Sequence, residues 1–261
     1  MIFSAPETDS IHALWDELAD FEAASVTASR DHLLHGLCRL IGAKNAAWIG
    51  AVRMGQAADH DPLNGWRPRL IHFLHPTQHL SSAAREQSDG IDAGMIDETT
   101  IRNGAFSGAY RVNRLVDLVP RSWFEGAYYR TYYQALGFHD AIWAGVPINK
   151  DAEIYIGLFR SGPGLSYTEA ERDRVGYALR GLRWFHRQQM LGHGLFAAAS
   201  PLTQTERAVL QGLLRGNPEK TIAAALGHSS HTTHEYIVRI YRKYGVNSRA
   251  ELMSLWLGRS Q

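Results

Sequence analysis

The stretch LTQTERAVLQGLLRGNPEKTIAAALGHSSHTTHEYIVRIYRKYGVNSRAEL, residues 202–252, decides the architecture of the C-terminal end of this chain. It opens with Thr203 and Glu206, a T-x-x-E capping box in which each side chain satisfies a backbone N–H of the other residue. Apolar residues then recur at helical spacing, at positions 209, 210, 213 and 214. The pattern predicts a first helix that ends near Gly216.

A second, shorter helix follows. Asn217 offers a capping oxygen, and Pro218 fits the first helical position because its missing N–H costs nothing there. Apolar residues at 222, 223 and 226 give this helix a buried face, and Gly227 ends it.

Two more helices complete the segment. Ser229 or Ser230 caps a third helix that ends at Gly245, with apolar residues at 236, 237, 240 and 244 on one face. Ser248 and Glu251 form another capping box, which opens a fourth helix over residues 249–257. Two small helices joined by a tight turn, as predicted for the second and third, are the arrangement of a helix-turn-helix motif.

With these elements in place, the segment resembles the LuxR/FixJ-type helix-turn-helix domain. The matching positions are Leu202, Thr203, Glu206, Leu210, Gly216, Lys220, Ile222, Ala223, Leu226, Gly227, Ser229, Thr232, Ile240, Lys243, Gly245, Val246, Ser248, Arg249, Ala250 and Glu251. The resemblance implies sequence-specific binding of double-stranded DNA as a homodimer, with the third helix in the major groove and the fourth helix at the dimer contact. It covers the last quarter of the chain.

The resemblance also implies which residues meet DNA. Its base-facing positions fall on His234, Glu235 and Val238, and its phosphate-facing positions on Lys220, Ser229, Thr232, Arg239 and either Arg242 or Lys243. Three residues depart from the family pattern, namely His228, Thr233 and Tyr236, and all three belong to the packing of the corner. Glu235 has two interpretations: a surface charge in solvent, or a carboxylate that accepts from a cytosine amino group or holds a neighbouring Arg.

The charge distribution agrees with a DNA-binding C-terminal end. Residues 201–261 carry eight Arg or Lys and four Glu, whereas the whole chain has a net charge of only +1. The basic excess therefore lies in the helix-turn-helix segment, and the near-neutral total predicts moderate non-specific binding that weakens with salt.

Composition bounds the remaining functions. The 261 residues suffice for two domains, and a hydrophobic content of 45% can build a sizeable core. The single cysteine, Cys38, lies on an apolar helical face and excludes an intrachain disulfide. No run approaches the roughly 18 consecutive apolar residues of a membrane helix. We expect a cytoplasmic protein without membrane contact.

The predicted domain boundary lies where small residues interrupt a helical pattern. We assign residues 1–190 to a sensor domain, 191–201 to a linker, and 202–261 to the DNA-binding domain. Before the linker, one long helix is predicted over residues 167–189, starting at Thr168.

The N-terminal domain is predicted to be α+β, with a small antiparallel sheet flanked by helices, beside an all-α DNA-binding domain. The expected order is helix 10–21, helix 30–41, strand 46–53, strand 69–74, a mainly helical middle, strands 141–148 and 153–160, and the long helix. This order, with the block SWFEGAYYRTYYQALGFHDAIWAGVPI at 122–148, resembles GAF/PAS-like sensor domains.

Aromatic residues crowd this block and suggest a ligand pocket. We predict that ring faces hold an apolar or planar effector while hydroxyls orient it. The candidate ligand-binding residues are Trp48, Trp123, Tyr128, Tyr129, Tyr132 and Trp143. The same cluster could instead be core or a dimer interface, and the alternative function is a protein-interaction module that docks through the aromatic helix.

The sequence gives little support for acyl-homoserine-lactone sensing, zinc binding or enzymatic activity. Trp48 and Asp61-Pro62 are spaced as in acyl-homoserine-lactone sensors, but Val52 stands where tyrosine is expected. His72, His75 and His79 could be considered for zinc, yet no cysteine or carboxylate accompanies them, so we expect no metal and no cofactor. Catalytic and phosphate-loop motifs are missing from the sequence, and an enzyme is not expected.

Overall fold

The computed structural model describes residues 4–54, 60–162, 166–195 and 202–257. The chain divides into two compact units. One comprises Met1–Leu18 with Asp31–Arg183, and the other Ala19–Arg30 with Trp184–Gln261. Of the helices in the described ranges, none is long and apolar enough to cross a membrane.

The first unit is built on a five-stranded antiparallel sheet with the order β2-β1-β5-β4-β3. Its strands are β1 (Asn45–Arg53), β2 (Trp66–Phe73), β3 (Arg111–Arg114), β4 (Asp140–Asn149) and β5 (Ala152–Arg160). The α+β prediction for this unit is confirmed, but strand β3 lies in the middle region that was expected to be mainly helical. Its four residues, RVNR, are too few and too polar to show a strand pattern, and their pairing with β4 makes them a strand.

Strand register decides which side chains share a face of the sheet. On β1, Ile49 pairs with Ile71 of β2 and with Tyr155 of β5. Because successive side chains of a strand point to opposite faces, Trp48 lies on the other face from Ile49. The two faces therefore have different neighbours.

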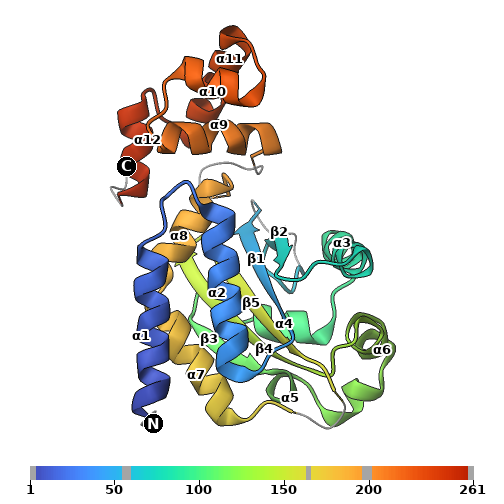
Figure 1. The fold of residues 1–261 in the computed structure, drawn as a ribbon. Coiled ribbons are helices and arrows are strands. Elements are labelled where there is room, and N and C mark those ends of the chain that lie inside the picture. Colours follow the sequence, from blue (N-terminus) through green and yellow to red (C-terminus); the bar gives the residue numbers. More distant parts are fainter. Residues whose placement is uncertain (1–3, 55–59, 163–165, 196–201, 258–261) are drawn as a thin grey trace. The chain divides into compact units, whose positions relative to one another are not determined.

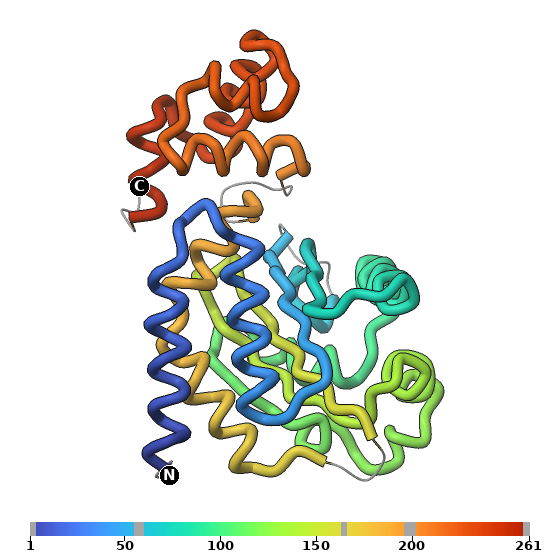
Figure 2. Tube along the Cα trace, viewed as in Figure 1, coloured from blue at the N-terminus to red at the C-terminus, as the bar shows by residue number. Residues whose placement is uncertain are grey.

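Helices cover both faces. Figures 1 and 2 show α1 (Ala5–Ala19), α2 (Val26–Ile41) and α7 (Glu169–Arg180) on one side of the sheet, and α3 (Gln78–Asp92) and α6 (Ala127–Tyr132) on the other. Trp15 Nε1 joins α1 to α7 through a 2.8 Å hydrogen bond to the Ala178 carbonyl. Between α3 and β4 the chain also forms four shorter helices: α4 (Glu98–Gly104), α5 (Leu115–Leu118), η1 (Arg121–Glu125) and η2 (Gln134–Leu136).

The single helix expected over residues 167–189 is two helices. α7 ends at Arg180, and α8 (Arg183–Gly192) begins three residues later. The predicted start at Thr168 is confirmed, because its side chain forms a capping box with Glu171. Gly181 occupies the C-cap of α7, where its low helix propensity favours a break that the apolar periodicity does not reveal.

The predicted linker at 191–201 is described only in part. Residues 191 and 192 still belong to α8, Gly194 adopts a positive φ of 76°, and the backbone N–H of Leu202 donates to the His193 carbonyl at 2.8 Å. Residues 196–201 lie outside the described residues.

The second unit contains the four predicted C-terminal helices: α9 (Gln204–Leu214), α10 (Glu219–Leu226), α11 (Ser230–Tyr244) and α12 (Arg249–Trp256). The Thr203/Glu206 capping box is present. Gly227 and Gly245 end their helices at φ of 66° and 64°, a conformation that favours glycine. Helix α10 begins one residue later than expected, with Pro218 rather than Asn217 at its cap. The hydrophobic core of the second unit includes Val209, Leu210, Leu213, Ile222, Ile237, Ile240 and Leu252.

Candidate DNA-binding surface and ligand cavity

Helices α10 and α11 meet through the short corner formed by Gly227 and His228. Ser229 caps α11, since its Oγ accepts from the Thr232 N–H at 3.0 Å. One face of α11 is buried against α9 and α10 through Thr233, Ile237, Ile240 and Tyr244. The opposite face is exposed and carries His231, His234, Glu235, Val238, Arg239 and Arg242.

The predicted base-facing residues His234, Glu235 and Val238 thus share one exposed face with Arg239 and Arg242. Val238 is an apolar side chain that is 41% exposed within this charged face, which suits contact with a thymine methyl group. Of the predicted phosphate-facing residues, Lys220 is exposed on α10, and the hydroxyls of Ser229 and Thr232 lie 2.8 Å apart at the start of α11. A helix N-terminus of this kind favours a phosphate.

Glu235 lies between two positively charged or chargeable neighbours. Its carboxylate is 3.7 Å from Arg239 and 3.6 Å from His231. Arg239 also lies over the Tyr236 ring, 4.8 Å from the centroid. Of the two interpretations of Glu235, this geometry favours the one in which the carboxylate holds a neighbouring Arg in place.

Arg242 and Lys243 differ in their surroundings. Arg242 is exposed, whereas Lys243 Nζ donates to Glu206 Oε2 at 2.7 Å, and the Glu206 side chain is only 4% exposed. Burial alone would raise the pKa of Glu206, but the bonds from Lys243 and the Thr203 N–H outweigh it and lower that pKa. We therefore expect Arg242 to be the phosphate contact of the pair and Lys243 to hold α11 on α9.

The three departures from the family pattern pack together at the corner or within the core. The His228 ring stacks on Tyr236, with centroids 5.6 Å apart and an interplanar angle of 23°, and Thr233 is fully buried. The corner is thus packed by a stacked pair of rings at two of the positions that depart from the family pattern.

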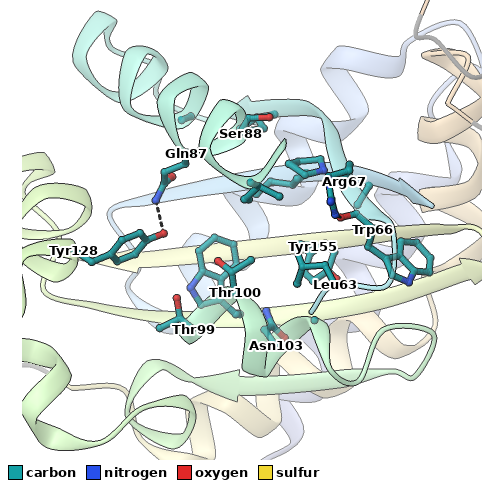
Figure 3. A pocket seen from close by; sticks show the side chains of 18 of the residues that line it. Leu63, Trp66, Arg67, Gln87, Ser88, Thr99, Thr100, Asn103, Tyr128 and Tyr155 are labelled. Atoms are coloured by element: carbon teal, nitrogen blue, oxygen red, sulfur yellow. Dashed lines mark hydrogen bonds between the residues drawn. The ribbon is translucent and has the colours of Figure 1, made fainter. Parts of the chain in front are cut away.

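The first unit contains a cavity of about 140 Å³ on the face of the sheet that carries α3 and α6. Ile49 and Ala51 of β1, Trp143 of β4 and Tyr155 of β5 contribute the sheet side. Helices α3 and α4 supply polar lining residues, which Figure 3 shows as Gln87 and Ser88 from α3 on one side and Thr99, Thr100 and Asn103 from α4 on the other. Strand β2 adds Arg67 to the lining, so the sheet side is mainly apolar or aromatic with one charged residue, and the lining residues from the helices are largely polar.

Two hydrogen bonds orient aromatic rings in the cavity wall. Gln87 Nε2 donates to the Tyr128 hydroxyl at 2.8 Å (Figure 3), and Trp143 Nε1 donates to the Tyr133 hydroxyl at 3.2 Å. Burial raises the pKa of both tyrosines well above the ordinary range, so both stay neutral phenols. Each hydroxyl used as an acceptor in the wall keeps its own O–H as a donor.

A buried ion pair lies next to the cavity. The Arg111 guanidinium on β3 pairs with Glu153 on β5, and their side chains are 8% and 0% exposed. Arg111 Nε also donates to Asn103 Oδ1 at 3.0 Å, and its guanidinium lies 5.1 Å from the Tyr155 ring centroid. Since Asn103 and Tyr155 line the cavity, the ion pair fixes two wall residues.

Sequence reasoning did not identify this polar cluster. Arg111 lies in the strand that was not predicted, and Asn103 lies on the short helix α4. The one available signal was Glu153, a carboxylate at the start of the otherwise apolar strand AEIYIGLFR. A charged residue in a strand buried on both faces needs a partner of opposite charge.

The predicted ligand-binding residues are placed differently from one another. Tyr128 and Trp143 line the cavity, and Tyr132 lines a smaller neighbouring one. Trp123 and Tyr129 pack beside them in an aromatic cluster, with centroids 5.5 Å apart. Trp48 is fully buried on the opposite face of the sheet and does not line the cavity. The period of two along β1 places its side chain away from the cavity wall, which composition alone could not show.

The histidines weighed for zinc do not converge. His72 Nε2 is bonded to Asp31 at 2.6 Å, and His75 and His79 are exposed. No group of three or more His, Cys, Asp or Glu side chains suited to a metal ion occurs in the part of the chain that the structure describes.

The helix-turn-helix geometry and the exposed basic face of α11 define a DNA-binding regulatory protein. Residues 200–256 match the family model described as bacterial regulatory proteins, luxR family, and the described part of this range, 202–256, forms a luxR-type helix-turn-helix domain. The resemblance drawn from the sequence is confirmed for this segment. Among curated proteins, none matches the chain significantly.

Solved structures with a similar course of the chain include two of SdiA and one of VqsR. SdiA in complex with octanoyl-rac-glycerol is 12% identical, with a TM-score of 0.48 over 97% of this chain and 94% of that one. Escherichia coli SdiA is 11% identical, with a TM-score of 0.46 over 93% of both chains. The VqsR LBD domain from Pseudomonas aeruginosa is 15% identical, with a TM-score of 0.44 over 72% of this chain and 98% of that one.

Proposed function

We propose that this chain is a ligand-responsive transcription regulator, in which a small molecule held by the N-terminal domain controls operator binding by a homodimer. The observation that carries the proposal is a cavity lined by both aromatic and polar side chains, in a chain whose residues 200–256 match the luxR family model. Ligand sensing and DNA binding each need a domain of their own. We assign the sensor to residues 1–190 and the DNA-binding domain to residues 202–261.

The cavity wall supports a ligand with a specific orientation. Cavities of about 150 Å³ hold molecules of the size of benzene. The volume here, about 140 Å³, therefore suits a compact ring or short-chain molecule. Tyr155 and Trp143 offer ring faces, while Thr99, Thr100 and Asn103 offer hydrogen-bonding groups on the other side.

DNA contact is proposed for the exposed face of α11 and its N-terminal turn. The base-reading residues are His234, Glu235 and Val238, of which Glu235 acts through Arg239. The phosphate-facing residues are Lys220, Ser229, Thr232, Arg239 and Arg242. A two-fold dimer presents two such faces, so the operator is expected to be pseudo-palindromic.

A substitution that fills the cavity should abolish ligand binding. Thr100 lines the cavity, so Thr100→Phe places a ring in the space that a ligand would occupy. Native mass spectrometry of protein purified from its own host should show a small bound mass with the wild type and none with this variant. Thr131→Phe, at an exposed position on α6, is the matched control and should keep the mass.

The ligand proposal fails if the wild type carries no bound mass and no added small molecule alters its affinity for DNA. A mass that persists in Thr100→Phe would move the ligand site elsewhere. The alternative function, docking of a partner protein through the aromatic helix, requires exposed rings. Tyr129 and Tyr133 are buried, which does not favour it.

Removal of a phosphate-facing charge should weaken binding to all DNA sequences alike. Arg242→Ala is expected to lower the slope of log K against log salt concentration by about 1, without a change in base preference. Titration of labelled operator and non-operator duplexes at several salt concentrations measures both quantities. Loss of affinity for the operator alone would place Arg242 at a base edge instead.

A further inference from the structure

His234 is an exposed side chain of α11, and one of its ring nitrogens forms a hydrogen bond with a residue of another helix. Its Nδ1 lies 3.0 Å from Oε1 of Glu219, which is the first residue of α10. The two residues are fifteen positions apart in sequence, and the corner at Gly227 brings them together. Both remain accessible, with side chains 63% and 39% exposed.

The chemistry of this contact determines which ring nitrogen of His234 carries the hydrogen. An ionised carboxylate only accepts hydrogen bonds, so Nδ1 of His234 must carry the hydrogen that it donates to Glu219. In a neutral imidazole only one ring nitrogen is protonated, and the partner of one nitrogen decides the state of the other. When the ring of His234 is neutral, its Nε2 is therefore an acceptor.

We propose that Glu219 sets the base preference of this protein by holding His234 in the tautomer whose Nε2 accepts a hydrogen bond. Glu219 is a positioning residue that need not touch DNA itself. The proposal rests on the proposed DNA-binding role of α11 and adds the kind of base edge that His234 reads.

The major groove offers few partners for such an acceptor. Adenine presents its N6 amino group and cytosine its N4 amino group, whereas guanine presents only the acceptors O6 and N7 and thymine the acceptor O4 with a methyl group. We therefore expect His234 to select adenine or cytosine at one position of each half-site and to disfavour guanine there.

Among the carboxylates near His234, Glu219 is the one that contacts its ring. Glu235, the other carboxylate on the exposed face, lies 3.6 Å from His231 and 3.7 Å from Arg239. Its ion pairs are made within α11, at i,i+4 spacing, while the Glu219 contact crosses from α10. The tautomer of His234 is consequently coupled to the packing of the two helices against each other.

The first test reads the tautomer without DNA. Long-range ¹H–¹⁵N spectra of the full chain, recorded at pH 8, should show His234 protonated at Nδ1 in the wild type. Glu219→Ala should shift the ¹⁵N pattern toward protonation at Nε2. Glu235→Gln removes an equal charge from the same surface and should leave the pattern of His234 unchanged.

The second test reads base preference. Operators selected from a random duplex library are compared for the wild type, Glu219→Ala, His234→Ala and the double variant. Preference for adenine or cytosine at one position should fall about three- to tenfold in each single variant, which is the worth of one hydrogen bond. The double variant should lose no more than either single one, because both act through the same contact.

Two results would overturn the proposal. One is an unchanged tautomer in Glu219→Ala, and the other is a Glu219→Ala variant that binds all sequences with altered affinity but the wild-type base preference. These outcomes differ from a failure of the proposed function, in which the wild type selects no operator at all while the spectra still report the tautomer.

Discussion

Arg111→Met should lower the free energy of unfolding of the first unit by about 3–5 kcal/mol, because it leaves the Glu153 carboxylate in the interior without its counter-charge. Glu153 is fully buried, and Arg111 also supports Asn103 and the backbone carbonyls of Phe106 and Ala109. Methionine fills a similar volume but supplies none of these donors. Urea denaturation followed by hydrogen exchange of peptides from β3, β4 and β5 measures the loss.

The deficit should depend on pH in a defined direction. Burial raises the pKa of Glu153, and the charge of Arg111 offsets this only in part. A carboxyl whose folded pKa is raised stabilises the fold in its protonated form, and this stability is lost as pH rises from the unfolded value of about 4.3 through the folded pKa. Without Arg111 the folded pKa rises further, so Arg111→Met should be more destabilised at pH 8 than at pH 5.

Two variants test this cause. Arg111→Met with Glu153→Gln removes the unpaired charge and should regain part of the lost stability, especially at pH 8. Arg102→Met breaks an exposed pair with Glu98 and should cost no more than about 0.5 kcal/mol. If Arg111→Met cost as little as Arg102→Met, the buried pair would not hold the cavity wall.

The C-terminal unit was predictable because its signals are local. Thr203 with Glu206, Ser229, Gly227 and Gly245 each mark a helix end within one turn, and a capping contact forms within a few residues of sequence. Short-range contacts of this kind can be inferred without knowledge of the tertiary fold.

The cavity was predictable only in part because its walls form over long separations. Tyr128 and Trp143 of the aromatic block line the cavity, and their contact with a ligand stays a prediction, whereas the face of Trp48 depends on strand register, which pairing partners set. Asn103, Arg111 and Glu153 meet only when β3 joins the sheet beside β4. A four-residue strand carries too few residues for its pattern to be recognised.

Lys243→Met should lower the free energy of unfolding of the DNA-binding unit by about 1–3 kcal/mol, because it leaves Glu206 buried with its Thr203 contact alone. The expected loss of unfolding free energy is smaller than for Arg111→Met, because Lys243 is 25% exposed and its charge is partly screened. Hydrogen exchange of peptides from α9 and α11 in urea measures the change.

The pH dependence here has the opposite sign. The folded pKa of Glu206 is lowered, so its stabilisation is complete above the unfolded value of about 4.3 and is lost as pH falls through the folded pKa. In Lys243→Met, the lowering influence of Lys243 is lost, so the pKa of Glu206 should be higher than in the wild type. The difference between wild type and variant should therefore be largest near neutral pH and shrink toward pH 4.

Arg242→Met is the matched control for Lys243→Met, since it removes the neighbouring positive charge from an exposed position. We expect it to change unfolding by less than about 0.5 kcal/mol but to lower the salt slope of DNA binding, as for Arg242→Ala. Lys243→Met should do the reverse, with lower stability and an unchanged salt slope for the fraction that remains folded. A Lys243→Met variant of wild-type stability with a reduced salt slope would assign the phosphate contact to Lys243 and remove its role in holding α11 on α9.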